Sequence, residues 1–209
     1  SANALSSGGW SAAMGIGAGI GGLTISQYGI ETALWIDSVT FLAAIILIMT
    51  LPHGGPEKSG IFSSGPKAMV AEILSGWKYI LSKPPIRRVV LAKAMWASGG
   101  GAQVFLLILI GREAGFGDVA AGIGILYMAR GFGSGFGPII SRRFMTNDRL
   151  VPYLLGGVLI ISGAFYMAVA VSEWTAIILV YVFISHAASG VNWVLSTTML
   201  QKRSEDEWL

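Results

Sequence analysis

The chain has 209 residues, of which 54% are hydrophobic and only 12% are charged, and its mean hydropathy is +0.68. Soluble domains carry about 25% charged residues, and disordered chains are poor in apolar residues, so this composition excludes both classes. The chain has no cysteine and only two histidines. We therefore expect no disulfide, no metal site and no cofactor.

Six apolar stretches are each close to the roughly 20 residues that cross a bilayer as a helix. They lie at about 8–26, 32–51, 86–110, 119–140, 150–171 and 174–200. The links between them are short, except for the one between the second and third stretches. The sequence therefore predicts an all-α polytopic membrane protein with six transmembrane helices.

The long link begins with a polar segment rich in glycine and proline and continues into an apolar pattern at about 68–82. There Met69, Ile73 and Trp77 fall on one stripe of a helix, a spacing typical of an amphipathic helix on a membrane surface. Two prolines at 84 and 85 are expected to end it.

The 14 basic residues are distributed very unevenly about these spans. Arg112 alone lies on one side of the membrane, and Lys93 and Arg130 fall within spans. By the positive-inside rule, the side that carries the other 11 basic residues is cytoplasmic. The net charge of +3 therefore reflects membrane topology, and we expect no nucleic acid as a partner. The other 11 lie on the opposite side: Lys58, Lys67, Lys78, Lys83, Arg87, Arg88, Arg142, Arg143, Arg149, Lys202 and Arg203.

Glycines cluster in the first and fourth spans at a four-residue spacing, as in Gly15/Gly19 and Gly131/Gly135. Small residues at this spacing allow two helix backbones to approach closely in lipid. The contact could be static packing, or it could let two helices slide or rock against each other. The candidate interface glycines are Gly17, Gly19, Gly21, Gly22, Gly131, Gly133, Gly135 and Gly137.

Arg130 lies about eleven residues from either end of its span, roughly 16 Å deep at 1.5 Å per residue. A charge at that depth normally faces a partner or a water-filled cavity. Arg130 could form a structural ion pair or cap a carbonyl, or it could contact a substrate anion or take part in coupling. Asp37, two turns into the second span, could carry a proton, pair with Arg130 or Lys93, or form a packing hydrogen bond.

His186, Gln103 and Asn192 are further polar residues inside spans. His186 could donate a single interhelical hydrogen bond or relay protons, and Gln103 and Asn192 could line a cavity. Ser134 and His186 also raise the question of an intramembrane serine protease. Phe132 stands where both the GxSG and GxSxG motifs require glycine, so we do not expect an enzyme.

Two segments give the chain a resemblance to a known family. Residues 2–5 read Ala-Asn-Ala-Leu and precede a glycine-rich span, and residues 35–42 read Trp-Ile-Asp-Ser-Val-Thr-Phe-Leu. Both resemble the major facilitator superfamily, in particular its branch of enterobactin exporters and macrolide-efflux permeases. The resemblance implies that the six spans are helices five to ten of twelve.

On this resemblance, residues 1–52 hold the last two helices of an N-terminal bundle. Residues 53–85 form a cytoplasmic linker with an amphipathic helix, and residues 86–209 hold the first four helices of a C-terminal bundle. The missing helices of the same transporter would be its partners.

Three shorter motifs are similar to family motifs. Residues 17–22 resemble the GPxxGG end of the antiporter motif, with Ala18 in place of proline. Residues 137–143 resemble the GxxxDR loop motif, with Ser141 in place of aspartate, which makes Arg142 and Arg143 candidates for a cytoplasmic loop latch. The acidic residues 205–207 resemble the start of the loop after helix ten.

The resemblance implies a secondary transporter in a bacterial-type inner membrane, with its basic loops cytoplasmic. We expect proton-coupled efflux of a small amphipathic molecule, such as a drug or siderophore, by alternating access. The alternative is a non-transporting membrane subunit that scaffolds a larger complex. That alternative predicts a dry interior in which Arg130 and Asp37 pair with each other or with carbonyls.

Overall fold

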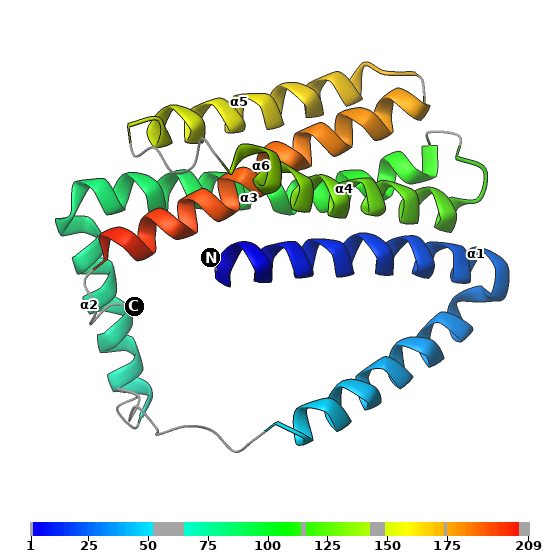
Figure 1. The fold of residues 1–209 in the computed structure, drawn as a ribbon, viewed down its shortest axis with the longest axis horizontal. Helices are drawn as coiled ribbons and strands as arrows, with labels where there is room; N and C mark the ends of the chain where they lie inside the picture. The colour runs from blue at the N-terminus through cyan, green and yellow to red at the C-terminus, as the bar shows by residue number, and fades with distance from the viewer. Residues whose placement is uncertain (1, 52–64, 114–115, 143–148, 174, 205–209) are drawn as a thin grey trace.

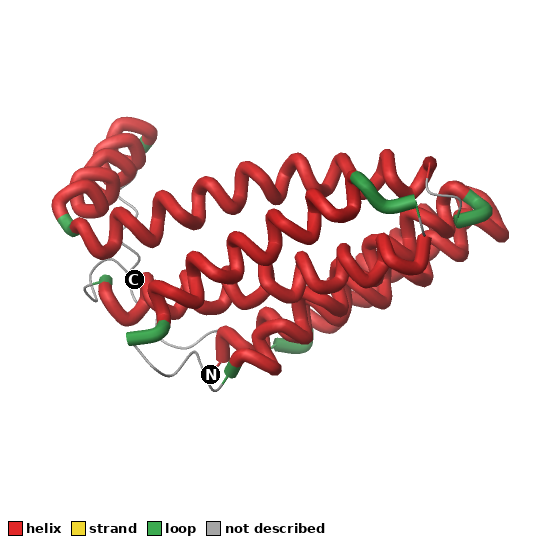
Figure 2. The backbone as a smooth tube through the Cα atoms, turned by 90° about the horizontal axis from the view of Figure 1, so that it is seen from above, coloured by secondary structure: helices red, strands yellow, loops and turns green. Residues whose placement is uncertain are grey.

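The computed structural model describes residues 2–51, 65–113, 116–142, 149–173 and 175–204. Helices make up every regular element in these ranges (Figures 1 and 2), which confirms the expected all-α class. They are α1 (Ala2–Met49), α2 (Pro66–Ser82), α3 (Pro84–Glu113), α4 (Val119–Ser141), α5 (Val151–Ala170) and α6 (Thr175–Arg203).

Helix α1 has a sharp break at Gly29, whose backbone torsions are φ 81° and ψ 166°. Glycine adopts this region readily because it has no Cβ. A straight helix of 48 residues would be about 72 Å long, more than twice the roughly 30 Å of a bilayer core. The break therefore divides α1 into two parts that match the first two apolar stretches of the sequence.

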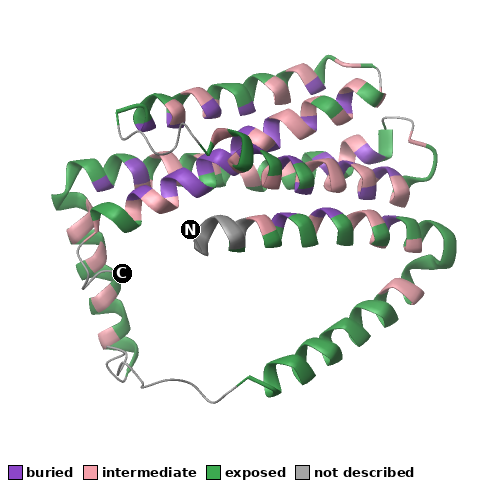
Figure 3. Cartoon of the chain, viewed as in Figure 1, coloured by how far each residue is buried: buried purple, intermediate pink, exposed green. Residues whose placement is uncertain are grey.

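The two parts of α1 have different surroundings. The first part runs beside α4, whereas the second part diverges from the other helices (Figure 1). Residues 34–49 are all exposed (Figure 3), and the hydroxyls of Thr32, Ser38 and Thr40 donate to backbone carbonyls three or four residues earlier in α1. Such bonds satisfy hydroxyl groups within an isolated apolar helix.

Helix α2 packs against α3 and contains no buried residue. Lys83, which is not helical, separates it from α3, and Pro84 is the first residue of α3. Proline is favoured at a helix start because its missing N–H is not needed there. The apolar side chains of Met69, Ile73 and Trp77 stay exposed.

Helix α6 is the centre of the bundle and contacts α3, α4 and α5, while α4 lies between α6 and the first part of α1. Buried residues accordingly gather on α4 and α6 (Figure 3). Leu107, Leu126 and Val182, from three different helices, are completely buried in one cluster. The interior is thus built around α4 and α6, which also supply the site described below.

Four described helices are long and apolar enough to cross a membrane: α1 from Gly8 to Met49, α3, α5 and α6. Helix α4 is not among them. The N-cap residue of α4 is Asp118, whose carboxylate accepts hydrogen bonds from the N–H groups of Ala120 (2.9 Å) and Ala121 (3.1 Å). The bond from Ala121, together with the Ser26 hydroxyl, holds the pKa of Asp118 below its usual value.

Candidate functional site

The first part of α1 packs on α4 through small residues. A Cβ added to Gly22 would lie 2.8 Å from the Cα of Gly124 and from the carbonyl oxygen of Ala120. A Cβ on Gly131 would collide with the backbone of Gly15. Residues with higher numbers in α1 contact residues with lower numbers in α4, so the two helices run antiparallel. Their backbones touch directly, as stripes of small residues allow.

The remaining candidate glycines of α1 differ in their surroundings. Gly19 faces the sulfur of Met128, 3.0 Å from where its Cβ would be, while Gly17 and Gly21 have nothing within 4 Å. Gly17 and Gly21 therefore lie off the contact with α4.

The other face of the glycine stripe on α4 packs against α6. A Cβ on Gly133 would collide with the carbonyl oxygen of Phe183, and one on Gly137 with the carbonyl of Ala187. Gly135 instead faces the side chain of Ser11 on α1, at 3.1 Å. Glycines on two faces of α4 thus contact two different helices, α1 on one side and α6 on the other.

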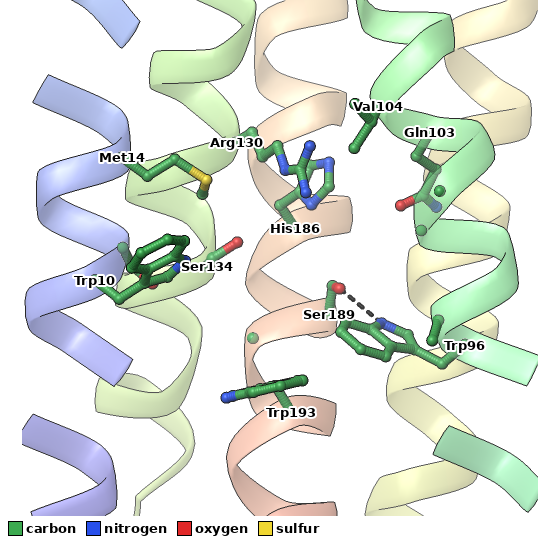
Figure 4. A pocket seen from close by; sticks show the side chains of 15 residues that line it. Trp10, Met14, Trp96, Gln103, Val104, Arg130, Ser134, His186, Ser189 and Trp193 are labelled. Atoms are coloured by element: carbon green, nitrogen blue, oxygen red, sulfur yellow. Dashed lines mark hydrogen bonds between the residues drawn. The ribbon is translucent and has the colours of Figure 1, made fainter. Parts of the chain in front are cut away.

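A cavity of about 560 Å³ opens where α1, α3, α4 and α6 meet (Figure 4). Its volume falls within the range of roughly 300–1,000 Å³ typical of sites for drug-sized ligands. Fifteen residues line it: Trp10, Ser11, Met14, Trp96, Ala97, Gly100, Gly101, Gln103, Val104, Arg130, Ser134, His186, Ser189, Gly190 and Trp193.

One end of the cavity is polar and carries a positive charge. The guanidinium of Arg130 lies 5.5 Å from the ring centroid of Tyr127, which is cation–π geometry. His186 is 3% exposed, and its Nε2 is 3.0 Å from the hydroxyl of Tyr166 on α5. Arg130 is close enough to act electrostatically on both His186 and Tyr166. The half-buried Gln103 lies at the same end (Figure 4).

The other end of the cavity is aromatic. The indoles of Trp96 and Trp193 have centroids 5.7 Å apart, and Trp96 Nε1 donates to the Ser189 hydroxyl at 2.8 Å. Lys93 Nζ lies 4.3 Å from the Trp193 ring centroid and donates to Thr197 Oγ1 at 2.7 Å. These contacts fix the two rings in position.

The structure brings Arg130, His186 and Gln103 together in this cavity, but not the other candidate residues. Asp37 is exposed on the second part of α1 and pairs with neither Arg130 nor Lys93. Asn192 is 1% exposed, and its Nδ2 and Oδ1 have no hydrogen-bond partner, but it does not line the cavity.

Of the two candidate latch residues, the structure describes one. Arg142 is exposed immediately after α4, and Arg143 lies outside the described residues. The acidic residues 205–207 also lie outside them. In the part of the chain that the structure describes, no group of three or more potential metal-binding side chains exists.

Reasoning from the sequence missed the aromatic half of the site and the partner of His186. Trp96 and Trp193 lie several residues inside their expected spans, whereas tryptophan is enriched at membrane–water interfaces, and this placement was the available signal. For Tyr166 on α5 there was no signal, because its pairing with His186 depends on how α5 packs against α6.

A family model described as Major Facilitator Superfamily matches residues 1–208. No curated protein and no solved structure gave a match. The family match agrees with the helical fold, the four helices able to span a membrane and the cavity between helices. The chain therefore belongs to the Major Facilitator Superfamily, a family of membrane transporters rather than enzymes.

Proposed function

We propose that this chain forms the central part of a secondary active transporter that exports a small amphipathic molecule through the cavity among α1, α3, α4 and α6. The observation that carries the proposal is Arg130, a charged residue from the middle of an apolar helix that lines a cavity of about 560 Å³. A charge at membrane depth is retained at an energetic cost, so it is a functional residue by default.

The placement of Asp37 favours transport over a scaffolding role. A scaffolding subunit would have a dry interior in which Arg130 and Asp37 pair with each other or with carbonyls. Instead Asp37 is exposed on a part of α1 that leaves the bundle, and Arg130 faces an open cavity.

The glycine contacts of α4 support an alternating-access mechanism. Alternating access in secondary transporters is largely a rigid-body rocking of helix bundles about a central site. Gly22 and Gly124 meet backbone to backbone, as do Gly15 and Gly131. At these two pairs no side chain lies between the two backbones, and we propose that the moving contact is here.

For coupling to protons, His186 is the better candidate among the described residues. Asp37 is not among the residues that line the cavity, whereas His186 lines it and its Nε2 lies 3.0 Å from the Tyr166 hydroxyl. A histidine that gains or loses a proton next to Arg130 would change the electrostatic potential where the substrate binds. We propose that His186 couples proton movement to substrate release.

The wider arrangement follows from the same reasoning. We propose that six helices cross a bacterial-type inner membrane, with the two parts of α1 counted separately and α4 included, and with the basic loops cytoplasmic. They would be helices five to ten of a twelve-helix protein in the branch of enterobactin exporters and macrolide-efflux permeases. The exposed second part of α1 would then pack against the remaining helices.

The test is proton-gradient-driven flux in everted vesicles containing the protein expressed from its complete gene. A panel of fluorescent amphipathic compounds should include anionic, neutral and cationic members, and an uncoupler gives the background. We expect uncoupler-sensitive flux of at least one compound, reduced more than tenfold in Arg130→Gln. Arg112→Gln, at the exposed end of α3, is the matched control and should transport normally. Absence of gradient-driven flux for every compound would contradict the proposal.

A further inference from the structure

The cavity wall carries charge of one sign only. Of the fifteen lining residues, all within the described part of the chain, Arg130 is the single charged one, and none is an aspartate or a glutamate. A further positive charge, that of Lys93, lies against the ring of Trp193. A ligand in this cavity therefore meets a positive potential.

The interactions of Arg130 leave its charge unbalanced. It contacts the ring of Tyr127, and a cation–π contact does not neutralise the charge of the guanidinium. It has no carboxylate partner among the described residues, and the polar side chains at this end include those of His186, Tyr166 and Gln103. A guanidinium offers a planar fork of donors that fits a carboxylate or sulfonate with two parallel hydrogen bonds.

The two ends of the cavity require different parts of one ligand. Arg130, His186 and Gln103 lie toward one end, and Trp96 and Trp193 lie toward the other (Figure 4). Lys93 already lies at 4.3 Å from the Trp193 centroid. Aromatic cages bind cationic ligands through free ring faces, so this lysine both occupies a face and repels a second cation.

We propose that the ligand of this cavity is an amphipathic anion, with an acidic head at Arg130 and a planar aromatic body against the tryptophans. Organic cations are excluded by the charge of the wall. The inference rests on the cavity being the transport site of the proposed function, and it names the substrate class. At about 560 Å³, the cavity accommodates a drug-sized molecule.

The test compares three probes that share one dansyl group and differ in charge: dansylglycine (anionic), dansylglycinamide (neutral) and dansylcadaverine (cationic, on a longer alkyl chain). Binding to the detergent-purified protein is measured by energy transfer from tryptophan to the dansyl group, which the tryptophans of the cavity wall make sensitive to occupancy. A charged hydrogen bond is worth about 1.5–3 kcal/mol. We expect dansylglycine to bind roughly 10- to 100-fold more tightly than the amide, and dansylcadaverine to bind most weakly.

Substitutions at Arg130 separate a direct contact with the anion from a structural role. Arg130→Gln should raise the Kd of dansylglycine to that of the amide while leaving the amide unchanged. Arg130→Lys should keep part of the preference, because it retains the charge but loses the planar fork. Arg112→Gln should keep the full preference for dansylglycine over the amide. If Arg130→Gln fails to fold, the wild-type series and Arg130→Lys still decide the question.

Two results would overturn the inference: a Kd for dansylcadaverine equal to or below that of dansylglycine, or equal weakening of all three probes in Arg130→Gln. Flux distinguishes this failure from failure of the proposed function. Gradient-driven flux of the cationic probe alone would refute an anionic substrate but would still support transport. Arg130-dependent binding of the anion with no gradient-driven flux of any compound would refute transport and leave the anion site standing.

Discussion

The contact between Gly22 and Gly124 offers a quantitative test of the α1–α4 packing. In Gly22→Ala the new Cβ would lie 2.8 Å from the Gly124 Cα and from the Ala120 carbonyl oxygen, both backbone atoms. Ordinary van der Waals contact begins near 3.4 Å, so the helices must separate by about 0.6 Å or the backbone must distort. Overpacking of a tight contact costs about 1–3 kcal/mol.

Gly21→Ala is the matched control, because Gly21 lies one residue away in α1 and has nothing within 4 Å. Both substitutions gain the same intrinsic helix propensity of alanine over glycine, about 1 kcal/mol, so this gain cancels in the comparison. We expect Gly22→Ala to be less stable than Gly21→Ala by about 1–3 kcal/mol. The free energy of unfolding in mixed micelles, followed by tryptophan fluorescence, measures the difference. Equal stabilities would refute the packing described for α1 and α4.

Two further predictions concern polar groups. Tyr166→Phe removes the hydroxyl 3.0 Å from His186 Nε2 and leaves a buried nitrogen without its partner. We expect the free energy of unfolding to fall by about 1–3 kcal/mol, measured as a lower Tm in detergent. An unchanged Tm would show that this hydrogen bond does not stabilise the fold. Asp118→Ala removes the acceptor for Ala121 and Ser26, and should lower the Tm at neutral pH. Because the folded pKa of Asp118 lies below its ordinary value, its stabilisation is complete above that value and is lost as pH falls through the folded pKa. The Tm difference between wild type and Asp118→Ala should therefore shrink in acid, and a constant difference would contradict the assigned role of this carboxylate.

Most helix positions could be predicted because hydropathy and proline mark them strongly. The stretches expected at 119–140 and 150–171 correspond to α4 at Val119–Ser141 and α5 at Val151–Ala170. The two prolines expected to end the helix at 68–82 lie at the start of α3, directly after Lys83. Apolar stretches limit where helices lie because lipid imposes a length and an absence of charge.

The rotation of each helix could not be predicted. In α1 the pairs Gly15/Gly19 and Gly17/Gly21 have the same spacing but are offset by two residues, which places them on nearly opposite faces. Nothing in the sequence of α1 alone says which face meets α4. The structure places Gly15 and Gly22 against α4 and leaves open space beside Gly17 and Gly21.

The residues of the polar half of the cavity were identified from the sequence, and those of the aromatic half were missed. Arg130, His186 and Gln103 stand out because polar groups inside apolar spans are costly. Trp96 and Trp193 are apolar enough to be taken for lipid-facing or packing residues. They become part of one wall only when α3 lies beside α6, where the centroids of the two rings are 5.7 Å apart.

Alternating access of this cavity is tested most directly by labelling one cysteine at position 134. The printed sequence contains no cysteine, and Ser134→Cys places a thiol of nearly the same size on the cavity wall. Lys67→Cys, at the exposed start of α2, is the control and should label from one side under all conditions. In oriented vesicles, a membrane-impermeant thiol reagent should reach position 134 from one side without a proton gradient and from the other side with it. Bound substrate should slow labelling from either side. Labelling of position 134 from the same side in every condition, or no labelling at all, would contradict the transport mechanism proposed for this protein.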